Sequence, residues 1–273
     1  MAAAEIEMVV RRPSFDFEAA ARNWMPRNPM LGYQLAAGSL SLPYLEPYLI
    51  RVMRQAKLAL GDQRPDLQAD IDLFSGQEAN HFKLHARLNA VLRNRYDGIA
   101  EIEAEIEADF ARMLREESLG WNLGYAAGFE TTGMLISQLF FDDVAESLDG
   151  ADPAIAGLWG WHLAEEYEHR CVAFDVYYAL GGTWRDRVRM YFYQQHHLRS
   201  VGERAAKLMR EQDRRAGHFI PTPEQTAASK KIEKKQRRAG ATRLALALLP
   251  WHDPRRHGPL EKADRLLAEL DWS

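Results

Sequence analysis

The sequence contains two copies of a short motif whose residues could bind a metal ion. Glu78 and His81 form one Glu-x-x-His pair, and Glu166 and His169 form the other. On a helix this spacing puts both side chains on one face, within reach of one ion. A single pair would be weak evidence, because an exposed Glu–His pair arises easily by chance. Both pairs lie on the apolar face of a predicted helix, where an unpaired carboxylate is unfavourable, so the pattern predicts metal ligands.

A further glutamate stands among apolar residues upstream of each motif. Glu46 lies 32 residues before Glu78, and Glu130 lies 36 residues before Glu166. These intervals fit one antiparallel helix hairpin in each half of the chain. Four helices would then present Glu, Glu-x-x-His, Glu and Glu-x-x-His to one centre, as in ferritin-like di-iron and di-manganese carboxylate proteins. We therefore predict an all-α fold, a ferritin-like four-helix bundle with additional peripheral helices.

His162 adds a third imidazole to the predicted centre. It precedes Glu166 by four residues and therefore shares a helix face with Glu166 and His169. The alternative is a histidine that is hydrogen-bonded within the core near Trp159 and Trp161. With His162, four carboxylates balance the charge of two divalent ions, and three neutral imidazoles complete the set. The predicted ligands are Glu46, Glu78, His81, Glu130, His162, Glu166 and His169.

Four further residues could orient these ligands without binding the ions themselves. His85 lies on the same helix face as Glu78, where simple packing is the alternative. Glu165 and Arg170 flank the second motif, where surface ion pairs are the alternative, and Asp175 follows it. We predict that some of these four residues support the centre from outside the ligand set.

The pattern of glycine, proline and apolar residues indicates helices throughout the chain. Long intervals between glycine and proline clusters have apolar residues three and four positions apart, which is typical of helices buried on one side. Predicted helices cover residues 44–60, 65–94, 97–117, 120–148, 153–180 and 184–212, and Pro47 could kink the first. We divide the chain into an N-terminal extension (1–38), the bundle (39–215) and a basic peripheral C-terminal segment (216–273).

The composition is that of a soluble globular protein. Of 273 residues, 47% are hydrophobic and 27% are charged, and the net charge of −4 disfavours nucleic acid as a partner. A basic run at 229–243 could touch phosphate locally, but a solvated helix face is the favoured interpretation because no aromatic residues interleave with it. The single cysteine, Cys171, excludes an internal disulfide and a thiolate-bound zinc site or iron–sulfur cluster built from this chain alone.

The apolar segments are too short for membrane insertion. None approaches the roughly 18 uninterrupted apolar residues of a spanning helix. The first residues lack the charged-then-apolar order of a secretory signal. We therefore expect a cytoplasmic protein without a membrane partner.

Several of these motifs also occur together in a known family. They are Pro43-x-x-Glu46, Gly76-Gln77-Glu78-x-x-His81, Glu130, and Trp161-His162-x-x-Glu165-Glu166-x-Glu168-His169-Arg170 followed by Ala173-Phe174-Asp175. Over about residues 12–195 the chain resembles a bacterial family described as predicted metal-dependent hydrolases, with the basic tail outside the resemblance. The spacing of the four glutamates and three histidines also resembles that of aryl-amine N-oxygenases. That second resemblance bears on the cofactor and not on the substrate.

The ligand set suits more than one chemistry. Carboxylates and imidazoles without thiolate suit iron or manganese, and zinc binds the same groups. We expect two iron ions and an O2-dependent di-iron oxidase or oxygenase that acts on a small organic substrate with an unidentified electron donor. The first alternative is a zinc- or manganese-dependent binuclear hydrolase, because paired ions activate water at neutral pH. The second is a non-catalytic metal-binding helical protein. Apolar faces outside the bundle could also form a homodimer.

Overall fold

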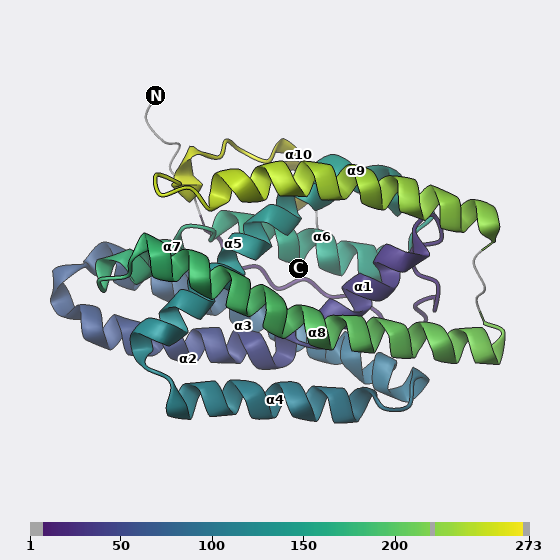
Figure 1. Cartoon of the computed structure of the whole chain (residues 1–273), viewed down its shortest axis with the longest axis horizontal. Coiled ribbons are helices and arrows are strands. Elements are labelled where there is room, and N and C mark those ends of the chain that lie inside the picture. Colours follow the sequence, from purple (N-terminus) through teal and green to yellow (C-terminus); the bar gives the residue numbers. More distant parts are fainter. Residues whose placement is uncertain (1–7, 219–221, 270–273) are drawn as a thin grey trace.

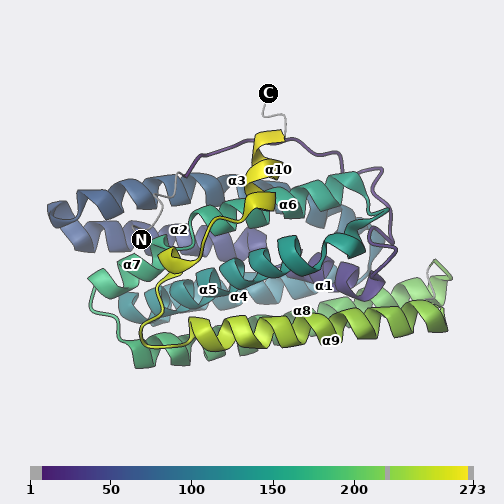
Figure 2. The ribbon, with the colours of Figure 1, turned by 90° about the horizontal axis from the view of Figure 1, so that it is seen from above.

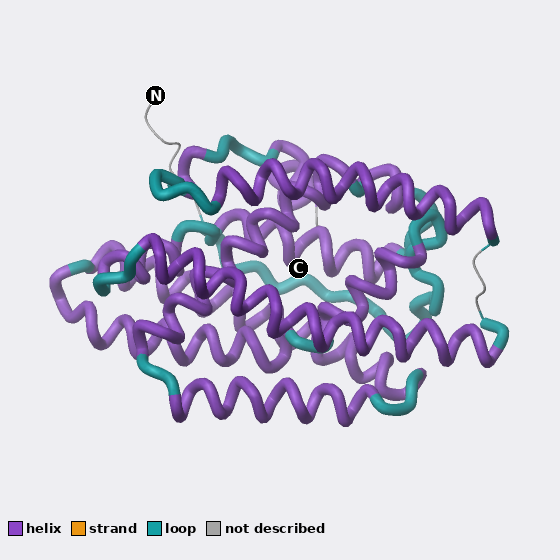
Figure 3. The backbone as a smooth tube through the Cα atoms, viewed as in Figure 1, coloured by secondary structure: helices purple, strands orange, loops and turns teal. Residues whose placement is uncertain are grey.

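The computed structural model describes residues 8–218 and 222–269. Within these ranges the chain forms helices joined by loops, with no strand (Figure 3). The all-α prediction is therefore confirmed, whereas the ferritin-like assignment of the bundle stays a prediction. The predicted N-terminal extension (1–38) and C-terminal segment (216–273) both reach into residues outside the described ranges.

The helices are α1 (Pro29–Ser39), α2 (Leu42–Leu60), α3 (Pro65–Arg95), α4 (Ile99–Glu116), α5 (Leu119–Asp143), α6 (Pro153–Glu168), α7 (Val172–Ala179), α8 (Trp184–Ala216), α9 (Pro223–Ala247) and α10 (Glu261–Glu269), with 3₁₀ turns at Gly61–Gln63, Ala145–Leu148 and Pro254–Arg256.

Side-chain caps fix where several of these helices begin. The Ser118 side chain accepts a hydrogen bond from the backbone N–H of Trp121 and so begins α5. Asp152 accepts from two backbone N–H groups at the start of α6, where Pro153 occupies the first turn. Such caps satisfy N–H groups that have no partner within the helix, and proline in the first turn removes no helical hydrogen bond. The starts of α3 and α6 at proline agree with the predicted boundaries.

The predicted helix over residues 153–180 is wrong as a single element, because the chain divides into α6 and α7. The backbone N–H of Val172 donates to the carbonyl of His169 at 2.9 Å, three residues earlier. This tight turn interrupts the four-residue hydrogen-bond pattern of α6, which ends at Glu168. His169 therefore lies at the C-terminal cap of α6 rather than in mid-helix.

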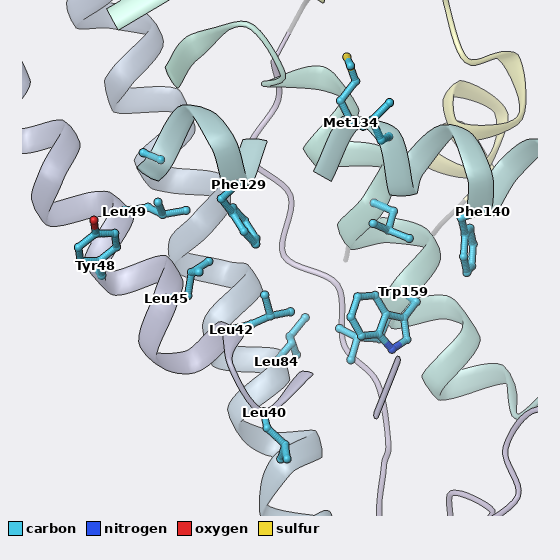
Figure 4. Packing of buried hydrophobic residues seen from close by; sticks show 14 of the residues in the cluster. Leu40, Leu42, Leu45, Tyr48, Leu49, Leu84, Phe129, Met134, Phe140 and Trp159 are labelled. Atoms are coloured by element: carbon cyan, nitrogen blue, oxygen red, sulfur yellow. The ribbon is translucent and has the colours of Figure 1, made fainter. Parts of the chain in front are cut away.

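The helices that carry the predicted ligands, α2, α3, α5 and α6, pack against one another in the middle of the molecule (Figure 1). α2 pairs with α3, and α5 contacts both α2 and α6. α8 and α9 pack on α5, α4 packs on α2, and α10 packs on α6. Buried side chains such as Leu45, Phe129 and Trp159 fill the space between these helices (Figure 4). The apolar packing removes water from the region where the carboxylates meet.

The described N-terminal residues, 8–28, form a segment without helix or strand that runs beside α3 and α6 (Figure 2). The carbonyl of Val9 accepts a hydrogen bond from Gln77 at 3.0 Å, and that of Arg11 accepts one from Asn80 at 3.0 Å. Phe17 is buried in the core. The segment therefore covers one side of the bundle. Among the described helices, none combines the length and apolar character that a membrane span requires.

Candidate metal centre

The seven predicted ligands converge in the interior of the bundle. Each is at most 2% exposed, so the centre is closed to bulk solvent. Glu46 comes from α2, and α3 supplies the first motif. Glu130 comes from α5, and α6 with its C-terminal cap supplies the remaining three residues. Four helices that are distant in sequence thus bring their polar residues to one place.

Within the described residues, six of these side chains form two groups that could each hold an ion. The first group is Glu46, His81 and His162, and the second is Glu78, Glu166 and His169. In each group the donor atoms lie within 4.8 Å of one another. The two residues of the first Glu-x-x-His motif therefore fall in different groups, whereas the spacing alone suggested one ion for both.

Two carboxylates lie between the groups. One oxygen of Glu78 is 3.9 Å from Nδ1 of His81, and the other is 3.3 Å from Nε2 of His169. The oxygens of Glu166 are similarly placed, 3.3 Å from Nε2 of His162 and 3.7 Å from Nε2 of His169. Each carboxylate thus faces one histidine of each group, which is the placement that a shared ligand needs.

Glu130 completes the surroundings of His169. Its Oε2 lies 3.2 Å from Nε2 of His169, on the same nitrogen that Glu78 and Glu166 approach. Three carboxylates thus surround one imidazole nitrogen. Such an accumulation of acceptors in a buried site is unfavourable unless cations or protons neutralise it.

The donor atoms of the centre fit a metal because they lack other partners. Neither carboxylate oxygen of Glu46, Glu78, Glu130 or Glu166 has a hydrogen bond among the described residues. Nδ1 of His81 and Nε2 of His169 are also without one. Buried polar atoms are nearly always paired in folded proteins, so this cluster of unpaired acceptors indicates that cations belong between them. The centre offers oxygen and nitrogen donors and no thiolate, which suits iron, manganese or zinc.

Gly133 makes room for Glu166. A Cβ atom at this position in α5 would overlap Oε2 of Glu166. Gly133 lies one helical turn after Glu130, so α5 provides both a carboxylate and the space for a second one from α6. A larger side chain here would displace Glu166 from the centre.

Outer hydrogen bonds orient two of the histidines toward the centre. Nε2 of His81 lies 3.1 Å from Oε2 of Glu165, and Nδ1 of His169 lies 2.9 Å from Oε1 of Gln77. An acceptor on one ring nitrogen places the proton there and leaves the other nitrogen free to bind a metal. Glu165 in turn pairs with Arg11 at 3.1 Å.

Two of these supporting residues escaped the sequence analysis. Gln77 directly precedes Glu78 and lies within a motif that carried the family resemblance, so its position was a usable signal. Arg11 comes from the N-terminal segment, 154 residues from its partner, and only the folded structure brings them together.

Arg170 and Asp175, which we predicted could support the centre, both contact the C-terminal segment, and a supporting role for them stays a prediction. Arg170 donates to the carbonyls of Pro254 at 3.1 Å and His257 at 3.2 Å. Asp175 pairs with Arg255. His85 does contact the centre, with Nε2 3.2 Å from Nδ1 of His162.

Burial shifts the pKa values of the centre in the directions expected for a metal-free cluster. Desolvation, assisted by repulsion from neighbouring glutamates, raises the pKa of Glu46 well above its usual value. The same two causes raise the pKa of Glu130 to about 7. Desolvation and the nearby His162 lower the pKa of His81. Without metal, burial therefore favours the protonated carboxyl groups of Glu46 and Glu130 and the neutral ring of His81.

These features define an all-helical protein with a buried carboxylate–histidine centre for metal ions. Residues 9–258 match the family described as predicted metal-dependent hydrolases, and the chain belongs to this family. The match extends beyond the expected 12–195 and includes the basic helix α9, which we had placed outside the resemblance. No curated protein and no solved structure matches the chain.

The family assignment corrects the expected reaction. We expected an O2-dependent di-iron oxidase or oxygenase, but the family is described as hydrolases, which agrees with the first alternative. The error has a physical reason, because the same oxygen and nitrogen donors serve redox-active and hydrolytic ions. The ligand spacing identified the centre but did not distinguish between the two reactions.

Proposed function

We propose that the protein is a binuclear metal-dependent hydrolase that uses two divalent ions, zinc or manganese, at this centre. The observation that carries the proposal is the pair of adjacent buried groups whose carboxylate oxygens lack hydrogen-bond partners. Glu46, His81 and His162 would hold one ion, and His169 with Glu130 would hold the other. Glu78 and Glu166 would be the shared ligands.

The chain's own residues prepare the site for hydrolysis. When bound, paired divalent ions act as Lewis acids that polarise a substrate oxygen and make hydroxide available near neutral pH. Glu165 and Gln77 hold His81 and His169 in the tautomers that present a free nitrogen inward. The four central carboxylates carry enough charge to neutralise two divalent ions. Exclusion of bulk water strengthens every electrostatic interaction inside the site.

A pocket beside the N-terminal segment marks where a small organic substrate would enter. It is lined by residues of α1, α3, α6 and α8, including Ala36, Leu88 and Ile155. Leu88 lies one helical turn from His85, and Ile155 lies one turn from Trp159, and both His85 and Trp159 contact His162. His85 and Trp159 would have to move for a substrate in this pocket to reach His162.

Metal analysis combined with a turnover assay tests the proposal. Protein loaded with zinc or manganese should contain two ions per chain and should hydrolyse an activated ester or phosphate ester. A chelator should abolish turnover, and added metal should restore it. The Glu166→Gln variant should lose at least one ion per chain and its activity. Glu105→Gln is the matched control, because Glu105 is an exposed glutamate on α4 that pairs only with Arg204 among the described residues.

Three results would overturn the proposal. The first is a protein that retains no divalent ion after dialysis. The second is turnover by Glu166→Gln equal to that of Glu105→Gln, which would place the measured activity outside the centre. Iron bound at two per chain with O2 consumption and no hydrolysis would likewise reject the hydrolytic assignment.

A further inference from the structure

A continuous chain of buried side-chain hydrogen bonds leads from the centre to the surface. Nδ1 of His162 lies 3.2 Å from Nε2 of His85, whose Nδ1 lies 2.8 Å from Oγ of Ser39. Ser39 contacts Oδ1 of Asn89 at 2.7 Å, and Asn89 contacts Glu103 at 3.2 Å. Glu103 pairs with the partly exposed Arg93 at 2.7 Å. Ser39, His85 and Asn89 are completely buried, so no solvent molecule can replace a lost partner in this series of hydrogen bonds.

The outer end of the chain fixes the orientation of Asn89. The Glu103 carboxylate, held by Arg93, can only accept hydrogen bonds when ionised. The backbone carbonyl of Ser39 also only accepts. Both acceptors face the same nitrogen of Asn89, at 3.2 Å and 3.0 Å. The Asn89 amide must therefore donate to them through Nδ2, and its Oδ1 must point at the Ser39 hydroxyl as an acceptor.

This orientation leaves only one arrangement of protons at Ser39. A serine hydroxyl has a single hydrogen, and Asn89 Oδ1 accepts it at 2.7 Å. Oγ of Ser39 must then accept the bond from His85, so Nδ1 of His85 carries a proton. His85 is packed against Trp159 and His162 with no exposed surface, which favours a neutral ring with one proton.

The same reasoning reaches the proposed ligand. A neutral His85 with its proton on Nδ1 presents a lone pair at Nε2, so it accepts from Nδ1–H of His162. His162 therefore keeps its Nε2, 3.3 Å from Glu166, as the nitrogen available to a metal. Each hydrogen bond in the series thus determines the direction of the next.

We propose that Ser39 is a positioning residue which, held by Asn89, sets the tautomer of His85 and thereby presents Nε2 of His162 to the metal. This inference rests on the proposed metal centre but not on the reaction carried out there. Removal of the hydroxyl would let His85 move its proton to Nε2 and donate to His162. His162 would then lose the acceptor that holds its proton on Nδ1, and metal binding would have to reverse both tautomers.

Three variants test the inference by metal affinity and by nitrogen-15 NMR of the histidine rings. Ser39→Ala should weaken the binding of one zinc ion by 10- to 100-fold, the range typical of residues that orient metal ligands. In the metal-free protein, the proton of His85 should shift from Nδ1 toward Nε2. Asn89→Leu should cause the same shift although it alters neither Ser39 nor His85, because the freed hydroxyl can then donate to His85. Ser39→Thr keeps the hydroxyl and should restore both readouts.

Ser41→Ala provides the matched control. Ser41 is another buried serine, two positions along, whose hydroxyl makes no cap hydrogen bond at the start of α2. Unchanged zinc affinity and an unchanged His85 tautomer in Ser39→Ala would overturn the inference, as would equal weakening by Ser41→Ala. If Ser39→Ala does not fold, Asn89→Leu decides by the same two readouts. A missing hydrolase activity would reject the proposed function and leave these readouts unaffected.

Discussion

Nε2 of His81 lies 3.1 Å from Oε2 of Glu165, and the other Glu165 oxygen lies 3.1 Å from Arg11. The side chains of His81 and Glu165 are both completely buried. The carboxylate therefore accepts from the outer nitrogen of His81 and leaves Nδ1, which has no other hydrogen-bond partner among the described residues, facing the centre. A residue of the N-terminal segment is thus joined through one glutamate to a proposed metal ligand.

This relationship predicts that Glu165→Gln weakens metal binding. The amide has one acceptor oxygen where the carboxylate has two, so it cannot accept from both His81 and Arg11. His81 would be free to place its proton on Nδ1. We expect a 10- to 100-fold loss of affinity for one ion, measured by competition with a chelator. Asp175→Asn is the control, because it also neutralises a carboxylate that is paired with an arginine, Arg255, but away from the centre. Equal affinities in the two variants would contradict the assigned role of Glu165.

The sequence was sufficient to predict the seven residues that the fold brings together, because each has a local signal. A glutamate on an apolar helix face, such as Glu46 or Glu130, stands out without knowledge of its partner. The helices themselves follow from apolar spacing and from proline at their first turns, as at Pro65 and Pro153. The break after Glu168 escaped prediction because no glycine or proline marks it.

The residues proposed to orient the predicted ligands lack such a local signal. Gln77, Ser39 and Asn89 are common polar residues whose roles arise from contacts between helices, 92 residues apart for Gln77 and His169 and 50 for Ser39 and Asn89. No spacing rule within one helix reports such a pair. The reaction also could not be predicted from the sequence, because a set of oxygen and nitrogen ligands does not specify which metal it binds.

Gly133 provides a test of how closely α5 and α6 must approach. Gly133→Ala should displace Glu166 and remove at least one ion per chain, because the new Cβ would overlap the Glu166 carboxylate. Gly120→Ala lies in the same helix with nothing within 4 Å of the added Cβ, and should retain both ions. Alanine at that exposed helical position should raise stability by about 0.5–1 kcal/mol. Metal content and chemical unfolding of both variants provide the comparison, and retention of two ions by Gly133→Ala would refute the packing argument.

The raised pKa values predict an unusual pH dependence for the metal-free protein. Burial raises the pKa of both Glu130 and Glu165 to about 7, against an ordinary value of 4.5. Between pH 6.5 and 8 the folded protein therefore holds protons that the unfolded chain has already lost. Stability is greatest below the unfolded pKa and falls as pH rises through the folded pKa, by on the order of 1 kcal/mol per carboxylate. Below pH 6.5 the lowered pKa values of His81 and His85 act in the opposite direction.

Urea unfolding at pH 6.5 and pH 8, with and without metal, measures this effect. With chelator present, the midpoint should fall over this interval. With zinc bound, it should rise or stay level, because ions replace the protons and bind more tightly as protons are released. The same downward slope in both forms would show that Glu130 does not bind the metal.

A variant at Arg170 tests whether this residue stabilises the fold or supports the metal centre. It follows His169 directly, yet its guanidinium donates to the carbonyls of Pro254 and His257 and lies over the ring of Tyr167, 4.0 Å from the ring centre. Arg170→Ala would leave these carbonyls without a buried donor, at a cost of about 3 kcal/mol in the free energy of unfolding. Because Arg170 makes its contacts with the C-terminal segment, the variant should still bind two ions per chain. Chemical unfolding and metal analysis on the same sample distinguish the two roles. Loss of an ion at unchanged stability would show that Arg170 supports the metal ligands. Loss of stability with two ions still bound would show that Arg170 attaches the C-terminal segment to the end of α6.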